Sequence, residues 1–120
     1  MMDAATKFNV VMREGVPVVQ IKGDLDHYNT PAFRTIITDL IDKGHTKIVA
    51  DMAGVEFMDS GGMSGIVFAI KRLSPLGGHI RLENCSRRIA RKFEIGGLTK
   101  LSEVLEVCPS AEKAENVSKR

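Results

Sequence analysis

The stretch Phe57-Met58-Asp59-Ser60-Gly61-Gly62 lies where an apolar strand is expected to pass through a loop into a helix. Before it, Lys47 to Met52 is short and largely apolar, as strands are in sheets that helices cover. After it, apolar residues recur at helical spacing from about Ser60 to Ser74, until Pro75 ends the pattern. The stretch therefore predicts a strand–loop–helix unit with Ser60 in the first turn of the helix.

The rest of the chain repeats this alternation. Strands are expected at Phe8–Arg13, Val16–Lys22, Lys47–Met52, His79–Asn84 and Val104–Val107, and helices are expected to begin at Thr30, Ser60 and Ser86. The turn Glu14-Gly15 joins the first two strands into a hairpin, whereas helical crossovers make the later strands parallel. The pattern predicts an α/β fold: a mixed, mostly parallel sheet with an N-terminal antiparallel hairpin and about four helices.

The first helix has the plainest sequence signals. The Thr30 hydroxyl is expected to cap it, because Pro31 follows and proline suits the first helical position. Its buried stripe is predicted to comprise Ala32, Phe33, Ile36, Ile37, Leu40 and Ile41. Residues 1–120 are expected to form one domain with a core over about 8–107, and residues 109–120 a terminal helix or a disordered tail.

Composition excludes several classes of function. The net charge of +2 is too small to indicate nucleic-acid binding, and without Trp and with one Tyr an aromatic base-stacking platform is not expected. No apolar run approaches the roughly 18 residues of a membrane span, and no signal peptide pattern opens the chain. Cys85 and Cys108 are expected to be reduced thiols. The sequence lacks a nucleophile elbow, a P-loop and histidines at ligand spacing. We therefore predict a cytoplasmic protein that is not an enzyme, binds no metal or cofactor and contacts no membrane.

Ser60 admits two interpretations. Its hydroxyl could simply cap the free amides of the helix start. Alternatively it could be phosphorylated, because a phosphate at a helix N-terminus meets unpaired amides and the positive end of the helix dipole. Gly61 and Gly62 would then leave the hydroxyl accessible to a kinase, at a cost in helix stability of roughly 1 kcal/mol for a glycine in a helix interior.

A second polar segment, Gly23 to Asn29, is expected beside Ser60. It contains Asp24, Asp26 and His27, and it follows a strand that is parallel to the strand before Ser60. Right-handed crossovers bring the two loops to one end of the sheet. Together with Asp59, these acids would make the surface around Ser60 negative. A phosphate adding roughly −1.5 to −2 charges there could repel a partner without changing the fold.

Five stretches together carry a family resemblance. They are Gly23-Asp24-Leu25-Asp26-His27, Lys47 to Asp51, Val55 to Met63, the Gly77-Gly78 turn with its following strand, and Ile95-Gly96-Gly97-Leu98. In this order over roughly residues 8–107, the chain resembles STAS domains, specifically bacterial anti-sigma factor antagonists. The family usually has Ser or Thr where this chain has Gly61.

The resemblance implies a phosphorylation switch. Ser60 would be the acceptor, phosphorylated by an anti-sigma factor that is itself a serine kinase of the GHKL type, and a PP2C-type phosphatase would restore the hydroxyl. The unphosphorylated chain would bind the kinase and free the sigma factor. The predicted partner-binding residues are Asp24, Asp26, His27, Asp59, Ser60, Gly61, Gly62, Ser64 and Phe68. Phe68, on the helix flank away from the core stripe, is either an anchor for the partner or a side chain covered within the chain.

Three further interpretations stay open. The basic group Arg87, Arg88, Arg91 and Lys92 is a solvated helix face or the contact for an acidic partner. Asp51 follows an apolar strand, as the acceptor of a Mg²⁺-dependent receiver-like domain would. A STAS adaptor subunit of a transporter or stress-signalling complex, with Ser60 only capping, would keep the fold and change the function.

Overall fold

Five strands form one sheet in the order β1-β2-β3-β4-β5, and the computed structural model describes residues 5–110. The strands are β1 (Lys7–Arg13), β2 (Val16–Lys22), β3 (Lys47–Gly54), β4 (His79–Cys85) and β5 (Leu105–Pro109). β1 pairs antiparallel with β2, and every later pair is parallel. The predicted mixed sheet with an antiparallel N-terminal hairpin is thus confirmed.

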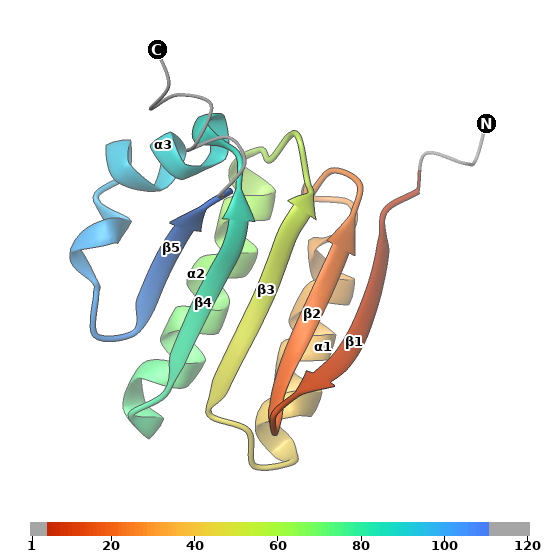
Figure 1. Cartoon of the computed structure of the whole chain (residues 1–120), viewed down its shortest axis with the longest axis vertical. Coiled ribbons are helices and arrows are strands. Elements are labelled where there is room, and N and C mark those ends of the chain that lie inside the picture. Colours follow the sequence, from red (N-terminus) through yellow and green to blue (C-terminus); the bar gives the residue numbers. More distant parts are fainter. Residues whose placement is uncertain (1–4, 111–120) are drawn as a thin grey trace.

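Helices cover one face of this sheet. They are α1 (Thr30–Asp42), α2 (Ser60–Leu73) and α3 (Arg87–Ile95), with 3-10 turns η2 (Ser74–Leu76) and η3 (Leu98–Lys100). Figure 1 shows α1 and α2 behind the sheet, and α3 at the end where β4 and β5 terminate. The fourth helix proposed for residues 109–120 lies almost entirely outside the described residues.

The core fills the space between the sheet and α1 and α2. Alternate residues of the strands point into it, as the pleat of a strand requires, and they include Val19, Ile21, Ile48, Ala50, Ile80 and Leu82. From the helices, Phe33, Ile37, Ile66 and Leu73 are fully buried against them. Burying a side chain of this size contributes about 1.5–3 kcal/mol, so this layer fixes where α2 begins relative to the sheet.

Within residues 5–110 the opposite face of the sheet carries no helix, and a pair of charged side chains extends over two of its valines. Arg13 of β1 donates two hydrogen bonds, of 3.1 and 2.7 Å, to the carboxylate of Glu83 on β4. Val18 and Val49 are almost completely buried although they lie outside the main core. The ion pair reaches across the strands that carry these valines, which explains their burial.

Several sequence expectations differ from the structure. The α1 cap is Asn29 and not Thr30, because Thr30 is buried and its hydroxyl donates to the Gly61 carbonyl oxygen at 3.0 Å. Ala32 is exposed, so it does not belong to the buried stripe of α1. The last strand begins at Leu105, since the Val104 amide donates to Leu101 in a turn. By contrast, both cysteines are free thiols as expected, with Cys85 in the core and Cys108 half-buried.

Candidate functional site

Two loops that follow parallel strands form the site. The β2–α1 loop (residues 23–29) and the β3–α2 loop (residues 55–59) pair through their backbones: the Leu25 amide donates to Phe57 at 3.0 Å, and the Asp59 amide donates to Leu25 at 3.4 Å. Leu25 and Met58 form a short parallel bridge, and both are fully buried. The sequence expectation that these loops meet at one end of the sheet is confirmed.

The β2–α1 loop is shaped by its own polar side chains. The Asp26 carboxylate accepts the amides of Tyr28 and Asn29 at 3.0 and 3.1 Å. Asn29 in turn accepts the Asp26 amide at 3.0 Å and donates to the Asp24 carbonyl oxygen at 2.8 Å. Asp26 therefore holds the loop in shape, whereas the carboxylate of Asp24 is exposed at its surface.

The start of α2 is capped by Asp59. Its backbone is extended, and its carboxylate accepts the Gly62 amide at 2.9 Å, which is the usual N-cap geometry. The interpretation of Ser60 as the cap is therefore wrong. Ser60 is the first residue of the helix, it is exposed, and its hydroxyl makes no hydrogen bond within residues 5–110. The hydroxyl is consequently available for chemistry without loss of the cap.

Asp59 stays charged in this position. The hydrogen bond from the Gly62 amide lowers the pKa of Asp59 below its ordinary value of 3.8, and His27 lowers this pKa further. The His27 Nδ1 atom lies 3.6 Å from the Asp59 carboxylate, and the imidazole packs on Tyr28 with ring centroids 4.0 Å apart. A fixed negative charge thus lies on the residue directly before Ser60.

Gly61 and Gly62 allow the β2–α1 loop to touch the helix. A Cβ on Gly61 would lie 2.6 Å from the Cα of His27 and 2.8 Å from its backbone nitrogen. A Cβ on Gly62 would overlap the Leu25 carbonyl group and lie 2.8 Å from the Cγ of Met58. This close approach of backbones explains both glycines, and the expectation that they give a kinase access to the Ser60 hydroxyl stays a prediction.

Ser64 and Phe68 lie along the seam between α1 and α2. The Ser64 hydroxyl donates to the Gly61 carbonyl oxygen at 2.6 Å and accepts from Arg34 at 3.2 Å. Phe68 is half-buried, with the guanidinium groups of Arg34 and Arg72 at 5.3 and 5.7 Å from its ring centroid. The phenyl ring is thus partly covered within the chain, and a role in partner binding stays a prediction for both residues.

Two aromatic side chains at this site are not among the residues predicted from sequence. Tyr28 in the β2–α1 loop is 82% exposed, and Phe57 in the β3–α2 loop is 48% exposed. They belong to the two loops whose backbones pair beside Ser60. The sequence gives no signal that singles them out, because isolated exposed apolar side chains are common on protein surfaces.

Three observations concern the metal-site, receiver-like and membrane interpretations. Residues 5–110 contain no cluster of three or more His, Cys, Asp and Glu side chains that could bind a metal. Asp51, the acceptor in the receiver-like alternative, accepts hydrogen bonds from Asn84 at 3.0 Å and from the Ala53 amide at 3.1 Å. Within the same residues, no helix has the length and apolar character that a bilayer crossing requires.

Comparisons with known proteins agree with the fold. The family model for the STAS domain matches residues 7–114. The anti-sigma-B factor antagonist of Bacillus subtilis (strain 168) is 33% identical over 86 residues, which cover 72% of this chain and 78% of the relative. The structure of the anti-sigma factor antagonist SpoIIAA in its unphosphorylated form is similar with a TM-score of 0.67 and 25% identity, covering 96% of each chain. The phosphorylated form of SpoIIAA from Bacillus is similar with the same TM-score and identity, over 92% of this chain and 99% of that one.

Proposed function

The chain belongs to the STAS domain family, among the anti-sigma factor antagonists, and we propose that phosphorylation of Ser60 controls its binding to an anti-sigma factor. In this proposal the anti-sigma factor is a serine kinase of the GHKL type. The unphosphorylated chain binds the kinase in the cytoplasm and thereby frees the sigma factor. The kinase transfers phosphate from ATP to the Ser60 hydroxyl, which ends the interaction, and a PP2C-type phosphatase restores the hydroxyl.

The position of the Ser60 hydroxyl carries this proposal. It is exposed at the first turn of α2, and Asp59 supplies the cap that the helix needs. A phosphate at this position would lie near the unpaired amides of the helix start, which favour negative charge. The fold can therefore carry the modification. SpoIIAA, which is similar to this chain, has been solved in phosphorylated and unphosphorylated forms. This supports the proposal that phosphorylation acts on this chain too.

Electrostatics account for the switch. The Asp59 carboxylate and the exposed Asp24 make the surface beside Ser60 negative before modification, and phosphate adds roughly −1.5 to −2 charges. Two like unit charges 4 Å apart repel by about 1 kcal/mol in water and about 4 kcal/mol at an effective dielectric of 20. A tenfold loss of affinity needs only about 1.4 kcal/mol. One phosphate facing an acidic or closely fitted partner surface thus suffices to separate the complex.

Phosphotransfer and binding can be tested with the same variants. The chain is incubated with ATP and the candidate serine kinases of its genome, and the phosphate is located by mass spectrometry. Wild type should gain one phosphate, at Ser60, and Ser60→Ala should gain none but still bind the kinase. Ser60→Asp should bind at least tenfold more weakly. Ser102→Asp adds the same charge to an exposed turn before β5 and serves as the control, with wild-type affinity expected.

Two results would contradict the proposed control of kinase binding by Ser60 phosphorylation. If Ser60→Asp and Ser60→Ala bind the kinase as wild type does, negative charge at Ser60 does not control binding. If in addition no native kinase modifies the chain, a constitutive STAS adaptor is the correct function. In either case the fold described above is unaffected.

A further inference from the structure

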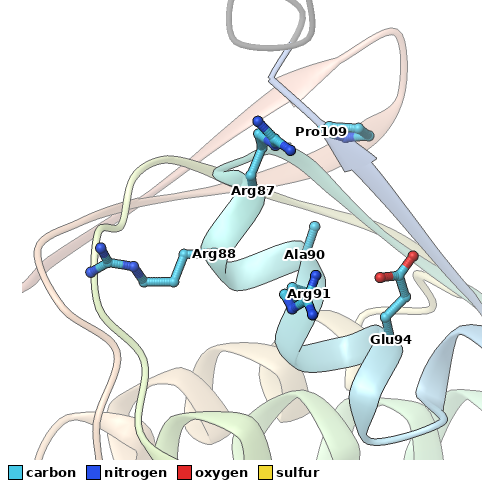
Figure 2. Close-up of a pocket in the computed structure, with 6 residues that line it drawn as sticks. All are labelled: Arg87, Arg88, Ala90, Arg91, Glu94 and Pro109. Atoms are coloured by element: carbon cyan, nitrogen blue, oxygen red, sulfur yellow. The ribbon is translucent and has the colours of Figure 1, made fainter. Parts of the chain in front are cut away.

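A cleft on α3 contains a concentration of positive charge that the Ser60 site does not use. It has a volume of about 420 Å³ and is lined by Arg87, Arg88, Ala90, Arg91, Glu94 and Pro109 (Figure 2). The helix contains three arginines and one lysine against a single glutamate. The ion pairs of residues 5–110 involve Arg13, His27 and Arg81, and none includes an arginine of α3.

The fold holds these arginines outward. Ile89 and Phe93 are fully buried and anchor α3 against the sheet end, and the Ser86 hydroxyl caps the helix by accepting the Ile89 amide at 3.2 Å. Arg87, Arg88 and Arg91 are consequently all exposed. Exposed cations on a rigid helix, without a carboxylate partner in the described part of the chain, form a preorganised contact for an anion.

The helix that carries the cleft, α3, lies close to the β3–α2 loop, which leads into Ser60. The Lys92 ammonium group lies 5.9 Å from the ring centroid of Phe57, which precedes Ser60 by three residues. In Figure 2, Arg87, Arg88 and Arg91 extend from α3 in different directions, and Glu94 lies on the side away from Arg88. A protein that docks on the Ser60 loop and on Phe57 therefore comes within reach of the α3 arginines.

We propose that the arginine-lined cleft of α3 is a second contact area for the serine kinase and binds an acidic peptide segment of it. This inference rests on the function proposed above. Arg87 and Arg91 are four residues apart on one helix face, so their side chains start about 5–6 Å from each other. Alternate residues of an extended peptide are about 6.6 Å apart, so successive carboxylates on one side of such a segment can each pair with a guanidinium group.

Other anions fit the cleft less well. Sites for small molecules bury about 70–90% of the ligand, whereas this cleft is open and its arginines are exposed. Nucleic acid binding requires a larger basic excess than a net charge of +2, and Asp24 and Asp59 on the same end of the molecule would repel a polyanion. A short acidic segment of a protein that also contacts the Ser60 loop satisfies both constraints.

The test compares two charge-matched variants by calorimetric titration with the kinase. Arg87→Glu/Arg91→Glu removes the cleft charge, and Lys47→Glu/Lys71→Glu makes the same change at exposed positions outside it. Each substitution subtracts two charges, so both variants change the net charge from +2 to −2. The cleft variant should bind the kinase at least roughly tenfold more weakly than wild type, because two attractive exposed ion pairs become repulsive. The affinity of the control variant should remain within about twofold of wild type. The deficit should shrink in 1 M salt, where the screening length falls to about 3 Å.

The outcomes separate this inference from the proposed function. If Ser60→Asp weakens binding and the cleft variant does not, the α3 contact is wrong and the switch stands. If the wild-type chain binds no kinase, both the proposed switch at Ser60 and the proposed contact at α3 are wrong. A deficit that is unchanged by salt would exclude an acidic segment. Saturable chemical-shift changes at α3 with ATP alone would instead assign the cleft to a phosphate ligand. Tighter kinase binding by Glu112→Gln/Glu115→Gln, with the cleft arginines intact, would instead assign the cleft to the chain's own residues 111–120.

Discussion

Replacing Gly61 by alanine should destabilise the protein although alanine is the better helix former. The added Cβ would lie 2.6 Å from the Cα of His27, whereas carbon atoms in contact normally lie about 3.5–4.0 Å apart. The β2–α1 loop would therefore have to retreat by about 1 Å. It cannot do so freely, because the Leu25 amide is bonded to Phe57 and the Thr30 hydroxyl is bonded to the carbonyl oxygen of Gly61 itself.

The magnitude follows from two opposing effects. Overpacking of a closely fitted contact costs about 1–3 kcal/mol, and the gain in helix propensity offsets at most about 1 kcal/mol of it. Because the added Cβ would meet backbone atoms of His27, the cost lies in the upper half of that range. A net loss of about 1–2 kcal/mol is expected, which corresponds to a fall in Tm of roughly 4–8 °C for a domain of this size. His27 should also move, so its amide resonance should shift more than those of α3.

The assay is thermal unfolding followed by circular dichroism, with Gly96→Ala as the matched control. Gly96 ends α3 with a helical backbone, and the nearest atom to an added Cβ there is the Lys92 carbonyl oxygen at 3.3 Å. The control should therefore change Tm much less than Gly61→Ala. Equal Tm values for Gly61→Ala and wild type would refute the argument that the contact with the β2–α1 loop requires this glycine.

Two further predictions concern ionisable groups. The pKa of Asp59 is lowered in the folded state, so its contribution to stability is present above its unfolded pKa and is lost as the pH falls through the folded value. Denaturant titrations between pH 6 and about pH 2 should consequently show a steeper acid loss for wild type than for Asp59→Asn, and parallel curves would contradict this linkage. Burial raises the pKa of the Cys85 thiol to about 12, so at pH 8 a thiol reagent should modify Cys108 in the native chain and leave Cys85 untouched. Modification of both thiols at equal rates under native conditions would show that Cys85 is not sealed in the core.

Much of the fold could be predicted from periodicity and turn residues. Val16–Lys22 was predicted with its observed bounds, and the Ser86 cap of α3 was predicted correctly. The meeting of the β2–α1 and β3–α2 loops also followed from sequence, because right-handed crossovers leave the loops after parallel strands at one end of a sheet. These features depend on local pattern and general topology, which a single sequence contains.

The details of the site depended on contacts between elements. Asp59 and Ser60 are neighbours and both residue types cap helices, so only the backbone turn at Asp59 decides which one does. Phe68 falls outside the core stripe of α2 on a helical wheel, but α1 supplies Arg34 to cover it. The purpose of Gly61 likewise depends on His27, which is distant in sequence. Such contacts between separate elements are not encoded in the pattern of either element alone.

Asp59 caps α2 and Ser60 does not, which explains how a modification of Ser60 could change partner binding without changing the stability of the fold. Had Ser60 been the cap, a phosphate there would have replaced the hydroxyl that satisfies the helix amides, and stability and signalling would have been coupled. Because the Asp59 carboxylate holds the Gly62 amide, the Ser60 hydroxyl is free of a structural task. The same carboxylate places a fixed negative charge beside the acceptor, so an added phosphate increases a repulsion directed outward. The proposed switch therefore requires that unphosphorylated and phosphorylated chains unfold at similar temperatures while differing in affinity for the kinase.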